Sequence, residues 1–147
     1  MMKTLATLAV LALASAASPA FAGSCPAGQA GENPLTGAAT MPKAVTDTVI
    51  STVDLGSEIN VPSRSLRIRK LVLQPGGIVP LHSHVDRPAL ILTSSGSVTE
   101  YRSNCLVPVV HRAGEVSNEA GGISHWWKNT GKTVAILYSS DVHNDAK

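Results

Sequence analysis

Short apolar runs separated by Gly, Pro, Ser or Asn make up most of this chain from residue 44 onward. Many of them are rich in Val, Ile, Leu and Thr and show partial alternation, which favours strands. No convincing helix, internal repeat or coiled-coil heptad stands out, and many short strands are typical of an all-β barrel or sandwich. The strands predicted are Ala44–Leu55, Ser65–Leu73, Ile78–His84, Ala89–Thr93, Val98–Tyr101, Leu106–His111, Ile123–Lys128 and Val134–Ser139.

Turn signals separate several of these strands. Pro75-Gly76 is a tight-turn dipeptide and predicts a turn before the strand that carries the first histidines. Gly96 lies between two apolar runs and predicts a hairpin loop, and Asn129-Thr130-Gly131-Lys132 predicts the turn into the last strand.

The first residues have the pattern of a signal peptide. A lysine at position 3 precedes an Ala- and Leu-rich stretch from Leu5 to Ala17, and Ala20-Phe21-Ala22 is a small-x-small cleavage signal. We expect cleavage after Ala22, export by the general secretory route, and a periplasmic or secreted protein; the alternative is an uncleaved anchoring helix. The predicted organisation is a cleaved signal peptide at 1–22, a leader segment at 23–43 and one barrel domain at 44–147.

Charge excludes few functions but argues against nucleic acid. The formal net charge is +2, and removal of the signal peptide lowers it by the one lysine that it carries. The basic residues on one run alternate with apolar ones, which favours the outward face of a half-buried strand over an anion site. These basic residues are Arg64, Arg67, Arg69 and Lys70.

The two cysteines, Cys25 and Cys105, both lie beyond the predicted cleavage site. Disulfides form in the oxidising compartments that exported proteins reach, so we expect these residues to pair and to tie the leader to the barrel. The alternative is two free thiols, one of them catalytic, but no neighbouring histidine motif supports it.

Three of the five histidines are spaced as one metal site requires. His82 and His84 are two residues apart, so on a strand both point to the same face. His125 comes from a distant predicted strand. We interpret His111 and His143 as ordinary surface or loop residues.

Two segments resemble the two conserved motifs of the cupin family over roughly Leu66 to Asp141. Seven motif positions agree and two depart, with Ala89 in place of the usual glutamate and Ala120 in place of a proline. The resemblance implies a double-stranded β-helix, the jelly-roll or cupin barrel. The first motif matches at Gly76, His82, His84 and Gly96, and the second at Gly114, Gly122, His125 and Asn129, with the histidine pair counted as one position.

The predicted cofactor is one divalent transition metal, Cu, Zn, Ni, Mn or Fe, bound by His82, His84 and His125. Without the glutamate, three neutral imidazoles would leave the ion fully dicationic, and Asp86 is the nearest substitute carboxylate, more readily interpreted as solvated. Glu100 and Tyr101 are the candidate acid/base residues, because one of the two should face inward. Trp127 has the parity of His125 and is a candidate for the pocket wall or plain core.

Two functions remain open from the sequence. The first is a small exported metalloenzyme with dioxygenase-, isomerase- or lyase-type chemistry on a small molecule. The second is a cupin that binds a metal or ligand without turnover. We expect a small-molecule ligand or substrate, no nucleic acid and no stable membrane insertion, and a homodimer is compatible with either function.

Overall fold

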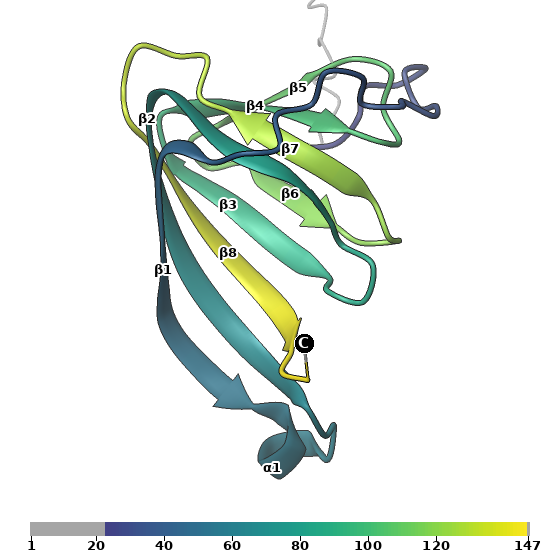
Figure 1. Ribbon diagram of the computed structural model, residues 1–147, viewed down its shortest axis with the longest axis vertical. Coiled ribbons are helices and arrows are strands. Elements are labelled where there is room, and N and C mark those ends of the chain that lie inside the picture. Colours follow the sequence, from purple (N-terminus) through teal and green to yellow (C-terminus); the bar gives the residue numbers. More distant parts are fainter. Residues whose placement is uncertain (1–22, 147) are drawn as a thin grey trace, which may run out of the picture.

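A computed structural model describes residues 23–146 and shows a nearly all-β molecule (Figure 1). The predicted signal peptide lies outside the described residues. The all-β prediction is confirmed, and the strands form a nearly closed antiparallel barrel. The elements are β1 (Lys43–Asp54), α1 (Leu55–Ile59), β2 (Arg64–Ser83), β3 (Ala89–Ser95), β4 (Ser97–Arg102), β5 (Val109–Arg112), β6 (Val116–Glu119), β7 (Ser124–Lys128) and β8 (Ala135–Asn144).

Strand order explains how distant segments reach the same interior. The strands run β5-β4-β7-β2-β8-β3-β6, and β1 pairs with β2 outside that path. The first half of β2 pairs with β8, and its second half pairs with β7. The long strand β2 therefore connects the tapering lower part of the molecule in Figure 1 with the upper part, where β4, β5 and β7 lie.

The predicted turn at Pro75-Gly76 is wrong, because β2 is continuous through it. Gly76 has a φ of 75°, which favours glycine, and its N–H donates to the carbonyl of Asn129 at 2.9 Å. The N–H of Asn129 donates in turn to the carbonyl of Gly77 at 2.9 Å. The glycines thus produce a local irregularity within a paired strand rather than a reversal of the chain.

Two elements gave no clear signal in the sequence. The short helix α1 begins after Asp54, whose Oδ1 accepts from the N–H of Gly56 at 2.8 Å, and it ends at Asn60 in the left-handed conformation. The strand β6 has no apolar alternation, because its inward residues are Ser117 and Glu119. A strand with a polar interior face cannot be found from hydrophobic periodicity.

The apolar core fills only part of the barrel interior. Buried charged and polar side chains occupy the rest. The buried polar side chains include those of the candidate site. The apolar core consists of Leu71, Leu73, Ile91, Val98, Trp127, Ala135 and Leu137.

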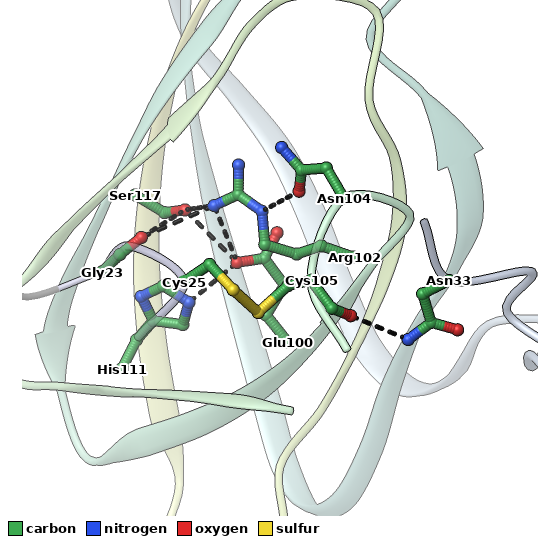
Figure 2. The surroundings of a disulfide bond; sticks show 9 residues. All are labelled: Gly23, Cys25, Asn33, Glu100, Arg102, Asn104, Cys105, His111 and Ser117. Atoms are coloured by element: carbon green, nitrogen blue, oxygen red, sulfur yellow. Dashed lines mark hydrogen bonds and ion pairs between the residues drawn. A yellow bond between two sulfur atoms is a disulfide. The ribbon is translucent and has the colours of Figure 1, made fainter. Parts of the chain in front are cut away.

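The leader segment packs against the barrel and is held there covalently. Cys25 and Cys105 form the expected disulfide, with 5.6 Å between their Cα atoms (Figure 2). A β-bridge pairs Ala30 with Cys105, and Asn33 Nδ2 donates to the Cys105 carbonyl at 2.9 Å. In the part of the chain that the structure describes, no helix has both the length and the apolar character needed to cross a bilayer.

Candidate metal centre

The three predicted metal-site histidines meet inside the barrel. His82 on β2 lies opposite His125 on β7 in the strand register. His84 follows the end of β2, and its N–H donates to the carbonyl of Ile123 at 2.8 Å, which keeps this segment beside the start of β7. The pairing of β2 with β7 therefore brings together residues that are far apart in the sequence.

The ring nitrogens are arranged as a metal ion requires. The Nε2 atom of His82 lies 3.1 Å from Nε2 of His84 and 3.1 Å from Nε2 of His125. Nitrogens bound to one ion at about 2.0–2.1 Å are separated by roughly 2.8–3.4 Å at octahedral to tetrahedral angles, so these separations fit a shared ion.

Hydrogen-bond acceptors beside the opposite ring nitrogens favour the tautomers that carry the proton on Nδ1. Nδ1 of His82 donates to the carbonyl of Pro80 at 2.8 Å, and Nδ1 of His84 donates to the carbonyl of Arg87 at 2.7 Å. Nδ1 of His125 donates to Oε1 of Glu100 at 2.5 Å. With each Nδ1 protonated, the three Nε2 lone pairs point at one another, which is unfavourable unless a cation lies between them.

All three imidazoles are held in the neutral form that binds metals. Burial lowers the pKa of His84 and of His125 to about 3, and the positive charge of neighbouring groups adds to the effect at His84. Burial also lowers the pKa of His82. Protons therefore compete weakly for this site near neutral pH.

A set of polar side chains that we call the acidic cluster lies behind His125: Glu100, Arg102, His111, Ser117 and Glu119. All five are buried. Glu100 Oε2 accepts from His111 Nε2 at 2.8 Å and from Arg102 Nη1 at 3.4 Å (Figure 2). Ser117 donates to Glu119, whose Oε2 lies 3.3 Å from His125 Nδ1.

The interpretation of His111 as a surface or loop residue is wrong, because its side chain is fully buried in this cluster. It lies on the inward side of β5 and contacts Glu100, which in turn holds His125. Sequence reasoning also missed Glu119. The inward residues of its strand are polar, which left no periodic apolar signal to find it.

On the other side of the histidines lies a cavity of about 210 Å³, the barrel cavity. Among the three metal-site histidines, only His82 lines it. Trp127 lines it as well and is also part of the apolar core, so both interpretations of this residue hold. The further lining residues are Asp47, Arg69, Leu71, Val79, Pro80, Arg87, Ile91, Leu137 and Ser139.

The prediction that the basic run faces outward is wrong for Arg67 and Arg69. Their side chains are each 16% exposed, whereas Leu66 is 45% exposed, so the arginines share the inward parity of Leu71. Asp141, a buried carboxylate on β8, provides the reason. It accepts two hydrogen bonds from Arg67, at 3.0 Å from Nε and 2.8 Å from Nη2.

The candidate acid/base residues do not line the barrel cavity. Glu100 faces inward but contacts His125 from the Nδ1 side, away from the converging Nε2 atoms. Tyr101 stacks on Trp126, with 4.1 Å between the ring centroids. The geometry thus gives Glu100 a role in orienting His125.

The remaining candidates take other positions. Asp86 forms an ion pair with Arg64 and accepts from Asn144 Nδ2 at 2.8 Å. Ala89, at the position of the family glutamate, is buried on the same side of β3 as Ile91. His143 lies on β8 and is half-buried.

No protein-family model matches this sequence, and a search of the curated proteins finds no match. Solved structures do match. The cupin domain of Cnp3 from Schizosaccharomyces pombe has a TM-score of 0.56 at 12% identity, with 71% of this chain and 68% of that chain covered. A predicted oxalate decarboxylase from Thermotoga maritima has a TM-score of 0.55 at 18% identity, with 72% and 93% covered.

A further match is an uncharacterized protein from Klebsiella pneumoniae with a double-stranded β-helix domain, at a TM-score of 0.55 and 16% identity, with 74% of this chain and 86% of that chain covered. The barrel is therefore a cupin fold, as the two motifs implied. The proteins that share it include a predicted oxalate decarboxylase and the cupin domain of Cnp3. A shared fold by itself leaves the activity open.

Proposed function

We propose that this cupin-fold chain is a small exported metalloenzyme that binds one divalent transition metal through His82, His84 and His125. The observation that carries the proposal is the convergence of the three histidines, with Nε2 of His82 3.1 Å from Nε2 of each of the other two and an acceptor beside each Nδ1. Export is supported by the signal-peptide pattern and by the disulfide between Cys25 and Cys105.

The donor set favours some metals over others. Three neutral imidazoles without a carboxylate suit Cu and Zn, with Ni next, better than Mn or Fe. The carboxylates nearest to the site, Glu100 and Glu119, lie on the Nδ1 side of His125, where they can support a ligand rather than bind the same ion.

Some residues orient the imidazole rings, and others give a small molecule access to them. The carbonyls of Pro80 and Arg87 and the carboxylate of Glu100 fix the three imidazole rings. The barrel cavity gives a small molecule access to His82. A metal bound here supplies Lewis-acid or redox chemistry at its open positions, for an oxygen-bearing substrate or dioxygen.

The second candidate function is a binding protein without turnover. One observation favours it: among the residues that line the barrel cavity, Asp47 is the only carboxylate, and it is paired with Arg69. A general base needs to reach the reacting proton directly or through one water, and Asp47 would have to leave this ion pair to do so.

Metal analysis of purified protein tests the proposal. We expect one metal ion per chain in the wild type and in His143→Ala, and loss of stoichiometric metal in His82→Ala and His84→Ala. His143 is the matched control because His111 contacts Glu100 and would disturb His125. Equal metal content in all variants would refute the site. A screen of the loaded protein for oxygen consumption and for turnover of small oxygen-bearing compounds then separates the two functions.

A further inference from the structure

The barrel cavity is bordered by more positive than negative side chains. Asp141 accepts from Arg87 Nη1 at 2.8 Å in addition to its two hydrogen bonds from Arg67, and Arg69 Nε lies 3.8 Å away from it. Asp47 pairs with Arg69. Of the side chains that line the cavity, two are arginines, Arg69 and Arg87, and one is a carboxylate, Asp47, which leaves one positive charge in excess before a metal ion is added.

Arg69 is incompletely satisfied. Its Nε is buried and has no hydrogen-bond partner among the described residues, and its Nη2 reaches Ser139 Oγ only at 3.5 Å. Burial lowers the pKa of Arg69, which reflects the cost of keeping this charge away from water. An anion in the cavity would offset that cost.

Arg87 connects the same cavity to the metal site. Its carbonyl accepts from Nδ1 of His84, and its side chain donates through Nη1 to Asp141. A guanidinium has five N–H donors in a planar fork, so Arg87 retains donors beyond this one contact.

The rest of the wall is mostly apolar. It presents aliphatic side chains and one indole ring to the space that the arginines border. A ligand that fits both surfaces combines one anionic group with a short hydrocarbon part. The apolar lining consists of Leu71, Val79, Pro80, Ile91, Trp127 and Leu137.

We propose that the barrel cavity binds a small organic carboxylate. The carboxylate oxygens accept from the guanidinium groups of Arg87 and Arg69, and the hydrocarbon part lies against the apolar wall. Since His82 borders the same space, the bound molecule also faces the metal's open side, a contact that rests on the proposed function. A carboxylate carries one negative charge and matches the excess of one positive charge, whereas a phosphate dianion exceeds it.

Calorimetric titration with a carboxylate and its neutral isostere tests this inference. Butyrate, butyramide and inorganic phosphate are titrated into zinc-loaded protein and into metal-free protein. We expect butyrate to bind at least about tenfold more tightly than butyramide, because charge-assisted hydrogen bonds from arginine are lost with the amide. In Arg87→Gln the preference for butyrate over butyramide should disappear.

Arg112→Gln is the matched control, since Arg112 is exposed on β5 and does not line the cavity. Thermal unfolding checks that each variant is folded. If Arg87→Gln is not folded, Arg87→Lys replaces it and should weaken butyrate binding by removing the planar fork while it keeps the charge. Equal affinity for butyrate and butyramide in the wild type, tighter binding of phosphate, or an equal loss in Arg112→Gln would overturn the proposal.

The metal-free titration separates this inference from the proposed function. If zinc does not bind, the proposed metal site fails, and a butyrate preference that depends on Arg87 in metal-free protein still supports the carboxylate site. If zinc binds but neither protein form prefers butyrate, the carboxylate site fails and the metal site stands.

Discussion

Two buried carboxylates, which flank Ala89 in the sheet register, have opposite electrostatic surroundings. Burial alone would raise the pKa of Asp141, but hydrogen bonds from Arg67 and Arg87 and the charge of Arg69 outweigh it and lower the pKa. For Glu119, burial raises the pKa, and the negative charge of Glu100 raises it further. Arginines thus surround the acid beside the cavity, whereas carboxylates crowd together on the enclosed side.

This difference separates two uses of buried charge. On the enclosed side, one arginine, one histidine and one serine serve two carboxylates, and the segment at Gly23 covers them (Figure 2). Such a closed set can orient His125 but is not accessible to a ligand. On the cavity side, guanidinium donors remain available next to open space, which is what recognition of an anion requires.

Acid should produce the largest effect in metal-free protein. The pKa values of His84 and His125 are about 3 in the folded state, against about 6.5 in an unfolded chain. Between these values the unfolded state binds more protons, so the free energy of unfolding should decrease as pH falls from about 6.5 toward 3. At about 1.4 kcal/mol per pKa unit, the loss amounts to several kcal/mol.

The two carboxylates should modify this acid response in opposite directions. Asp141, with its lowered pKa, adds to the loss of stability in acid, whereas Glu119, with its raised pKa, opposes it. Asp141→Asn should therefore flatten the dependence and Glu119→Gln should steepen it. Urea unfolding between about pH 7 and about pH 3 measures both, because Glu119 contributes above about pH 4.5 and Asp141 contributes below about pH 4. A flat profile in the wild type would contradict the assignment of neutral buried histidines.

Removal of Glu100 should disrupt the hydrogen bonds of the acidic cluster. Glu100→Ala leaves His111, Arg102 and His125 without their shared acceptor, so we expect a loss of about 3–5 kcal/mol in the free energy of unfolding. Metal affinity should also fall about 10–100-fold, because the orienting partner of His125 is gone. Urea unfolding and metal competition measure these effects.

The control is Glu58→Ala, at an exposed position in α1, which should change stability by no more than about 0.5 kcal/mol. Retention of full metal affinity in Glu100→Ala would show that the acidic cluster does not support the metal site.

Loss of the disulfide should reduce the free energy of unfolding less than acid or the removal of Glu100 does. Replacing Cys25 and Cys105 together by Ala removes a crosslink between residues 80 positions apart and should cost about 2–4 kcal/mol. The bridge holds the segment that covers the acidic cluster, and neither cysteine lines the barrel cavity. Butyrate binding in that cavity should therefore be unchanged. Chemical unfolding and calorimetry test this, and unaltered stability after reduction of the wild type would count against a structural tether.

The sequence by itself determined the fold class and the metal-site histidines. Strand periodicity is a local property, and the spacing of His82 and His84 places both on one face whatever the rest of the chain does. Their match to a family motif then supplied His125, which no local pattern connects to them. The cysteine pair followed from the export signal, because the redox compartment favours pairing of the two.

Only the tertiary structure decided how the buried charges are used. Alternation along β2 predicted that the basic residues face outward, but Arg67 and Arg69 face inward because Asp141 on β8 is buried beside them. His111 and Glu119 became interior residues because another strand, β4, carries their charged partners, Glu100 for His111 and Arg102 for Glu119. A charged side chain can be buried only where distant segments compensate it, and that compensation is not encoded in the local pattern of the strand that carries it.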